Sequence, residues 1–320
     1  MIIFPSYLSA PSALATISVC QEILESSGIA DINAVHLKFV DPFGMAMLGA
    51  CFDAARRQGC VFRVHQLSPD LSGYLQRMDV FTGVELVGRI QNNGMRRDRS
   101  DELVELTQLC DRSEVGNVAY RLAQAMIGRA DPDDLPDEMT GYTTYDRLVE
   151  PLQYALNELL ENSLTHARRG NKEACVWVAS QYYPKKGIIR LGVVDNGCGF
   201  LESLKTHVKL QHKRHLAAIL LALQPRVSCN RDLGLHSDSV NQGVGLTTSC
   251  RIAEHAGGRM ILASGNAMHS TSGYSGESTG AYWQGVGVAM EVNRSKLADV
   301  RVGELLPSLD DIPAVKLRFE

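Results

Sequence analysis

The side chains best suited to chemistry first gather between Asn157 and His166, where Glu158, Asn162 and His166 follow one another at intervals of four residues. In a helix this spacing puts the three side chains on one face. Leucines fall on the other side, where they can be buried: Leu156, Leu159, Leu160 and Leu164. A carboxylate and an amide oxygen on one stripe suit a hard cation and an activated water molecule. Polar stripes are more often simply solvated, so this one does not decide alone.

A second segment, Asp195-Asn196-Gly197-Cys198-Gly199, directly follows an apolar run that predicts a strand. Glycine permits positive φ and lets a ligand approach the backbone. A carboxylate at the end of a strand can accept a hydrogen bond from an exocyclic amine. Asp-Asn-Gly is also a good turn sequence, and a turn is the simpler interpretation of this segment taken alone.

A third segment, Gly243-Val244-Gly245-Leu246, lies where a helix is predicted to begin. Free N–H groups at the start of a helix, together with the helix dipole, favour a phosphate there. A single Gly-x-Gly is common. The three segments in this order and spacing are far more specific than any one of them.

An acidic residue and an asparagine four apart, then D-x-G-x-G after a strand, then G-x-G-L opening a helix, resemble the GHKL superfamily over about Tyr145 to Val292. That group includes gyrase-type ATPases, Hsp90, MutL, sensor histidine kinases and anti-sigma-factor kinases. Ala222 to Ser228 is also similar to the lid segment of its kinase-type members. The resemblance implies an α/β sandwich, the Bergerat fold, that binds ATP and Mg²⁺.

The resemblance also implies roles for the matching residues. Asn162 would ligate Mg²⁺, Glu158 would activate water, and Asp195 would accept a hydrogen bond from the adenine amino group. Gly197 and Gly199 would shape the adenine pocket. The third segment would lie beside the phosphates, through Gly243, Val244, Gly245 and Leu246.

Two features of this half depart from the pattern or stay open. Val286 stands where many relatives have a threonine whose hydroxyl helps to hold adenine, so that contact is in doubt. The long segment from Leu201 to Gln242, interpreted as the lid, carries cations that could meet the γ-phosphate. A solvated helix face accounts better for most of them: Lys205, Lys209, Lys213, Arg214, Arg226 and Arg231.

The first ninety residues alternate between strand-like and helix-like patterns, in the order β-α-β-α-β-α. This order predicts a small sheet with helices packed on it. The predicted strands cover residues 1–7, 32–40 and 60–67, and the predicted helices cover 10–27, 44–58 and a segment opened by Ser68-Pro69-Asp70.

The strand before Asp41-Pro42-Phe43-Gly44 and the helix after it resemble a STAS domain, the anti-sigma-factor-antagonist fold. Pro42 stands where that family has the serine that anti-sigma kinases phosphorylate. Proline cannot accept phosphate, so the resemblance implies a domain that docks a partner or contacts the ATP-binding domain.

The expected fold class is therefore α/β and α+β in two domains, with four parts in chain order. They are a STAS-like domain at 1–95, a helical linker region at 96–144, an ATP-binding domain at 145–293 and a tail at 294–320. Within them, Glu102 to Met126 is predicted to be one helix, and the Gly- and Ser-rich Gly265 to Gly280 a mobile loop.

Bulk properties agree with a cytoplasmic protein of two domains. The chain has 320 residues and a formal net charge of −4, which gives no overall reason to expect nucleic acid or anionic membrane as a partner. No uninterrupted apolar segment is long enough to span a membrane. The eight cysteines form no C-x-x-C pair and are interpreted as reduced thiols in the core.

The leading functional hypothesis is an ATP-hydrolysing switch whose two nucleotide states present different surfaces to an unidentified protein partner. One alternative is a serine/threonine kinase of the anti-sigma-factor type, in which Glu158 would orient an acceptor hydroxyl. Another is a non-catalytic, ATP-gated interaction module. An autophosphorylating histidine kinase is disfavoured because Glu102 to Met126 contains no histidine. A homodimer stays open.

Overall fold

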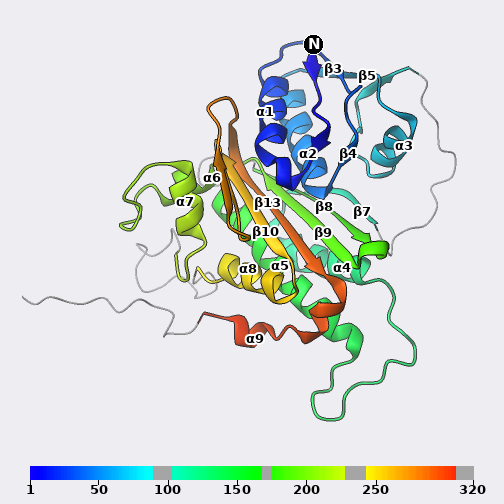
Figure 1. Ribbon diagram of the computed structural model, residues 1–320, viewed down its shortest axis with the longest axis vertical. Coiled ribbons are helices and arrows are strands. Elements are labelled where there is room, and N and C mark those ends of the chain that lie inside the picture. Colours follow the sequence, from blue (N-terminus) through cyan, green and yellow to red (C-terminus); the bar gives the residue numbers. More distant parts are fainter. Residues whose placement is uncertain (89–102, 168–173, 228–242, 308–320) are drawn as a thin grey trace, which may run out of the picture.

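The computed structural model of the chain describes residues 1–88, 103–167, 174–227 and 243–307, and it is a mixed α/β structure (Figure 1). The N-terminal residues form a parallel sheet with the strand order β1-β3-β5-β6. Parallel neighbours need crossover connections, which α1, α2 and α3 supply. The elements are β1 (Ile2–Ile3), β2 (Tyr7–Leu8), η1 (Ala10–Ser12), α1 (Ala13–Leu24), β3 (Ile29–Asn33), β4 (Phe39–Val40), α2 (Pro42–Arg57), β5 (Val61–His65), α3 (Pro69–Arg77) and β6 (Glu85–Val87).

The predicted β-α-β-α-β-α order is present, with one shift. The predicted strand at 32–40 is instead two short strands, β3 ending at Asn33 and β4 beginning at Phe39. Between them the Asn33 side chain accepts a hydrogen bond from the Val35 N–H at 2.9 Å. This local turn interrupts the run of branched residues. β4 then pairs with β2, apart from the main parallel sheet.

Within the described residues, seven strands form an antiparallel sheet in the order β12-β11-β10-β13-β9-β8-β7. Its strands are β7 (Leu103–Leu109), β8 (Val176–Tyr183), β9 (Ile188–Asp195), β10 (Arg259–Gly265), β11 (Ala267–Ser270), β12 (Tyr274–Glu277) and β13 (Trp283–Asn293). The remaining elements are η2 (Arg112–Glu114), α4 (Val115–Ile127), α5 (Thr144–Ala167), η3 (Pro184–Lys186), α6 (Gly199–Leu204), α7 (His215–Ala222), α8 (Gly245–His255), η4 (Arg294–Asp299) and α9 (Val302–Leu305).

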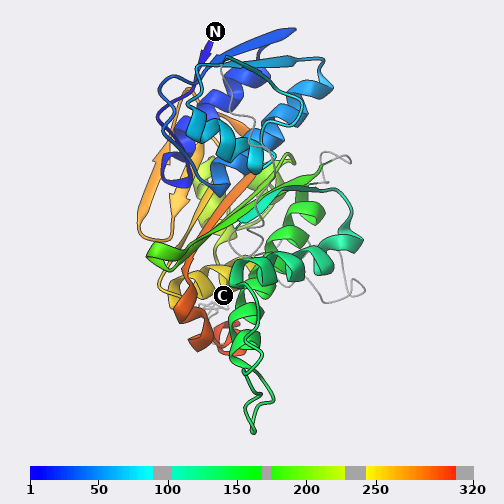
Figure 2. The same cartoon turned by 90° about the vertical axis from the view of Figure 1, so that its right-hand side faces the viewer.

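Helices cover both faces of this sheet. α4, α5 and α8 pack on one face, and the N-terminal elements pack on the other, with α2 against β8, β9 and β13 (Figures 1 and 2). The connection between α4 and α5 projects away from the body of the molecule (Figure 2). In the part of the chain that the structure describes, no helix has the length and apolarity needed to cross a membrane.

The start of α2 packs directly against two strands of the large sheet. A Cβ added at Gly192 in β9 would lie 2.5 Å from the backbone of Phe43, and one at Gly287 in β13 would lie 2.8 Å from the Phe43 ring. Asp41 caps α2 by accepting a hydrogen bond from the Gly44 N–H. Residues 42–52 are all buried, so this helix is part of a core shared with the sheet.

The prediction of one helix from Glu102 to Met126 is wrong in its first half. Residues Leu103–Leu109 form β7, which pairs with β8, and α4 begins only at Val115. The register of β7 shifts between Val104 and Thr107. This irregularity removes the period-two alternation by which a strand is recognised. The charged segment Arg96 to Asp101 lies outside the described residues.

The prediction of a mobile loop from Gly265 to Gly280 is also wrong. The segment contains the hairpin of β11 and β12, which extends the sheet beyond β10. Gly273 turns the chain with φ 96°, and the hydroxyls of Ser270 and Ser272 are 2.8 Å apart in the same turn. Small residues here serve a tight turn and not a flexible linker.

The prediction that all cysteines are reduced core thiols is wrong for one pair. Cys110, directly after β7, and Cys175, directly before β8, form a disulfide across 65 residues of sequence. The pairing of Leu109 with Val176 brings these neighbours together, which no local spacing reveals. Five others are buried and form no disulfide, as predicted: Cys20, Cys51, Cys60, Cys198 and Cys250. Cys229 lies outside the described residues.

Candidate functional site

Asp195, the last residue of β9, is buried with 3% exposure. Its Oδ1 accepts hydrogen bonds from the N–H of Gly197 at 2.9 Å and of Val286 at 3.1 Å. Burial raises the pKa of the Asp195 carboxyl to about 7, while these two N–H groups and the Ser163 hydroxyl act to lower it. The carboxylate is therefore oriented by two backbone N–H groups on Oδ1 and by the Ser163 hydroxyl.

The walls around Asp195 come from β13 and α5. The indole Nε1–H of Trp283 donates to the Asp195 carbonyl oxygen at 2.9 Å. A Cβ at Gly285 would lie 2.0 Å from that oxygen and 2.8 Å from Asp195 Oδ1, so only glycine fits there. Ser163, on α5, forms a hydrogen bond with the carboxylate. The end of β9 is thus fixed by both neighbouring elements.

The loop after Asp195 is held against β10 and β13. Gly199 has φ 75°, and a Cβ on it would lie 2.4 Å from the carbonyl oxygen of Gln284. The Ser264 hydroxyl donates to the Gly285 carbonyl at 2.8 Å and accepts from the Phe200 N–H at 3.3 Å. Gly199 therefore has a structural need that a side chain would violate.

Glu158 on α5 lies directly against the start of α8. A Cβ added at Gly245 would be 1.7 Å from Glu158 Oε2. Burial raises the pKa of the Glu158 carboxyl, the charge of Glu161 raises it further, and a hydrogen bond with Tyr154 lowers it. The structure thus brings the predicted carboxylate, Glu158, into contact with Gly245 of the third segment predicted from the sequence.

The other members of that glycine segment shape the entry to α8. Gly243 has φ 71°, and its carbonyl accepts from the Arg226 N–H at 2.8 Å. Val244 is the N-cap residue and has no side chain that could cap the helix by a hydrogen bond. Leu246 is half-buried against the core below the sheet. The preceding residues, Asn241 and Gln242, lie outside the described part of the chain.

Asn162 is half-buried on α5, one turn after Glu158 and next to Ser163. Glu158 contacts Gly245, and Ser163 contacts Asp195, so Asn162 lies on the stretch of helix between the two glycine segments. Among the described residues, no group of three His, Cys, Asp or Glu side chains is placed to hold a metal ion. The His166 side chain lies outside the described atoms.

The cations of the predicted lid separate into two kinds. Lys205 pairs with Glu202, and Arg214 pairs with Glu277. Arg226 differs, since its Nε is buried without a hydrogen-bond partner among the described residues. Its backbone adopts φ 60° beside Gly243. Arg231 lies outside the described residues.

Several residues around this site carry no motif and were not predicted. They are Tyr154, Ser163, Ser264, Trp283 and Gly285, together with the backbone N–H of Val286. Val286 lacks the hydroxyl expected from the resemblance, but its backbone N–H donates a hydrogen bond to Asp195. The one available signal was Ser163, a polar residue that directly follows Asn162 and falls among the leucines of its helix.

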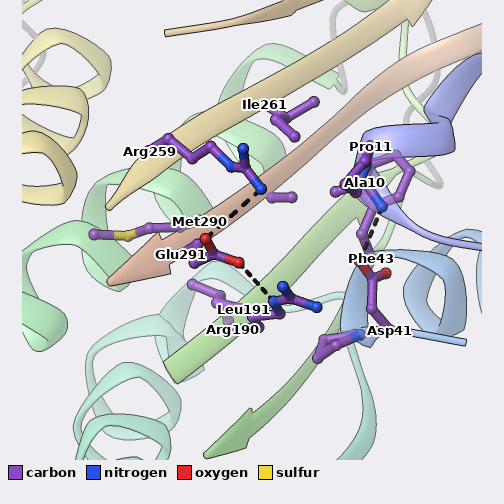
Figure 3. Close-up of a pocket in the computed structure, with 12 residues that line it drawn as sticks. Ala10, Pro11, Asp41, Phe43, Arg190, Leu191, Arg259, Ile261, Met290 and Glu291 are labelled. Carbon is purple, nitrogen blue, oxygen red and sulfur yellow. Dashed lines mark hydrogen bonds and ion pairs between the residues drawn. The ribbon is translucent and has the colours of Figure 1, made fainter. Parts of the chain in front are cut away.

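A separate small hollow lies on the opposite face of the sheet, between the N-terminal elements and the strands (Figure 3). Glu291 in its wall pairs with Arg190 at 2.7 Å and with Arg259 at 3.7 Å. Asp41 also lines it; burial raises the pKa of its carboxyl against the lowering effects of three backbone N–H groups and Arg190. These charges are paired within the interface and are distant in the fold from the Asp195 loop.

Comparison with models of known protein families, with curated proteins and with solved structures gives no match to this chain.

Proposed function

We propose that the chain binds Mg-ATP between α5, the Asp195 loop and the start of α8, in a domain of the Bergerat type. The observation that carries the proposal is the buried Asp195 carboxylate, with Oδ1 engaged by two backbone N–H groups. Its other oxygen can accept one more hydrogen bond from an exocyclic amine. A guanine carbonyl at that position would face a carboxylate, so the site favours adenine.

The phosphates would lie at the start of α8. This helix runs for 11 residues, and the glycines before and at its first turn leave backbone N–H groups accessible to an anion. Arg226 adds a guanidinium with a buried, unpartnered Nε at the same end among the described residues. An unpartnered buried donor is costly, and a phosphate oxygen would satisfy it.

Asn162 supplies an amide oxygen in the stretch of α5 that lies between the two glycine segments. Mg²⁺ in nucleotide sites is held by few protein ligands together with phosphates and water. A single amide ligand therefore fits this ion, and the lack of a three-carboxylate cluster among the described residues is no obstacle. When bound, Mg²⁺ would supply charge neutralisation at the phosphates.

Glu158 is the candidate general base for hydrolysis. Its pKa is raised by burial, which brings the carboxylate closer to the basicity that proton abstraction from water requires. Tyr154 holds the carboxyl through a hydrogen bond, and Gly245 leaves room for it beside the phosphate end of α8. We propose an ATP-driven switch that controls a protein partner.

The N-terminal unit, which we propose to be STAS-like, fits the role of a transmitting surface better than that of a substrate. Pro42 replaces the phosphorylated serine of that family and is buried at the start of α2. The unit contacts β9 and β13, the two strands that place Asp195 and the Val286 N–H. A change at the nucleotide site would therefore reach this unit through two strands.

The test combines binding and turnover. Asp195→Asn puts an amide donor where the amine would bind, so we expect Mg-ATP affinity to fall by about tenfold or more. Glu158→Ala should keep that affinity and lose phosphate release by about 100-fold or more. Isothermal titration and a phosphate-release assay measure the two effects. Unchanged affinity in Asp195→Asn would refute the adenine site, and full turnover in Glu158→Ala would refute the base.

A further inference from the structure

The Cys110–Cys175 disulfide lies at the edge of the proposed nucleotide site. It joins the end of β7 to the residue before β8, at the last pair of that ladder, Leu109 with Val176. The covalent loop that it closes contains α4 and α5, and therefore Glu158, Asn162 and Ser163. The loop closed by this disulfide therefore includes all of α5, which contributes these three polar side chains to the proposed site.

Cys175 is also bonded through its backbone to the Asp195 loop. Its N–H donates to Asn196 Oδ1 at 3.0 Å, and its carbonyl accepts from the Asn196 N–H at 3.4 Å. Asn196 stands between Asp195 and Gly197, whose N–H orients the Asp195 carboxylate. The position of Cys175 is therefore coupled to that of the carboxylate through Asn196, which is covalently bonded to Asp195.

The two halves of the disulfide differ in their access to solvent. Cys110 is exposed, whereas Cys175 is buried with 4% exposure. An incoming thiolate can thus attack at Cys110 Sγ, which breaks the S–S bond and leaves Cys175 as the departing thiolate. A second thiol of the reductant then attacks the mixed disulfide. Two protein thiols and one oxidised dithiol result.

We propose that this disulfide is a reversible redox latch on the proposed nucleotide site, opened by a dithiol reductant and closed by disulfide exchange. The inference rests on the proposed function for the identity of the ligand, Mg-ATP. The contacts of the disulfide with the Asp195 loop do not depend on that function. In the oxidised form Cys175 is tied to β7 and holds Asn196. In the reduced form that tie is lost, the Asp195 loop gains freedom, and the nucleotide must order it again on binding.

The experiment measures Mg-ATP affinity of the full-length protein in both redox states. Alkylation and mass spectrometry first establish that dithiothreitol releases two thiols from the folded protein and that an oxidised dithiol restores the bond. We expect affinity to fall about fivefold or more on reduction, within the range of coupling between linked sites. Cys110→Ser should show the weaker affinity in both states. Cys60→Ser, which changes a buried free cysteine of the N-terminal unit, should keep the wild-type redox response.

Equal affinity in the two states, or no release of the two thiols under native conditions, would overturn the latch. Hydrogen exchange separates this failure from failure of the proposed function. If neither state binds ATP, the nucleotide assignment is lost. Faster exchange of the Asn196 and Gly197 amides after reduction would then still support the latch, and unchanged exchange would refute it.

Discussion

At the scale of single residues, Asp195 combines burial with two opposing influences on its proton. Removal from water raises its pKa, and the N–H groups on Oδ1 lower it, with a result of about 7. A proton on Asp195 would go to the other oxygen, because Oδ1 already accepts two hydrogen bonds. That oxygen then becomes a donor and cannot accept from an amine.

Mg-ATP affinity should therefore rise with pH through about 7. Below this value the protonated carboxyl must lose its proton before it can accept from the amine, so affinity should change by up to about tenfold per pH unit there and level off above it. Ser163→Ala removes one hydrogen bond that lowers the pKa. The midpoint of the curve of Mg-ATP affinity against pH should therefore move to higher pH in this variant. Titration calorimetry from pH 5.5 to 8.5 measures both curves; the nucleotide's own titration is common to them.

A midpoint that Ser163→Ala leaves in place would show that another group controls the profile. Glu158→Ala is the control for titration of Glu158, because the pKa of this carboxyl is also raised and its titration would give a similar pH dependence. This variant should keep the wild-type midpoint for binding.

At the scale of elements, α5 and α8 meet at Gly245, where a side chain has no space. Gly245→Ala would place a Cβ 1.7 Å from Glu158 Oε2, so the glutamate or the helix must move. We expect Mg-ATP affinity to fall by about tenfold or more and the melting temperature to fall, since overpacking costs about 1–3 kcal/mol. Calorimetric binding and thermal melts measure the two effects.

Gly116→Ala is the matched control for this substitution. Gly116 is an exposed glycine in α4 with no atom within 4 Å of an added Cβ. Alanine there should stabilise the helix by about 0.5–1 kcal/mol and leave binding unchanged. Equal Mg-ATP affinity and equal melting temperature in the two variants would contradict a role for the Glu158–Gly245 contact.

The sequence pattern predicts helices at 145–168 and 244–256 and strands at 174–183 and 187–194, and α5, α8, β8 and β9 agree with these to within about two residues at each end. These elements have strong periodic or continuous apolar patterns and clear ends. β7 was taken for helix because its irregular register hides the alternation. The β11–β12 hairpin was missed because glycine and serine mark tight turns as well as linkers.

Contacts between distant segments were beyond sequence patterns. The Val286 N–H, Trp283 and Gly285 surround Asp195 across some ninety residues, and each depends on β13 pairing with β9. Likewise, the Cys110–Cys175 disulfide depends on β7 pairing with β8. Spacing can indicate candidate site residues, but the strand order determines which backbone groups orient them.

At the scale of the whole molecule, α2 joins the N-terminal unit to the large sheet through one core. Phe43 is 1% exposed and packs on β9 and β13. Phe43→Ala should therefore weaken both parts, by about 3–5 kcal/mol. Differential scanning calorimetry should show one transition in the wild type and two separated transitions in this variant.

Phe52→Ala is the control of equal size, because Phe52 is fully buried but stacks within the N-terminal unit on Phe62. Phe52→Ala should lower the stability of the N-terminal unit. In the double variant with Phe43→Ala, where the two transitions are separated, the transition of the large sheet should stay at the temperature that it has in Phe43→Ala alone. Two transitions in the wild type would contradict the shared core.

The buried start of α2 has a consequence for the order of synthesis. The ribosome delivers α2 early, whereas β13, one of the strands that cover it, ends only at Asn293. Translation of the intervening residues takes roughly 10–40 s at the usual rate of chain elongation. Until β13 is complete, the sheet that covers the apolar side of α2 lacks one of its central strands, so the nascent chain is a natural client for a ribosome-associated chaperone.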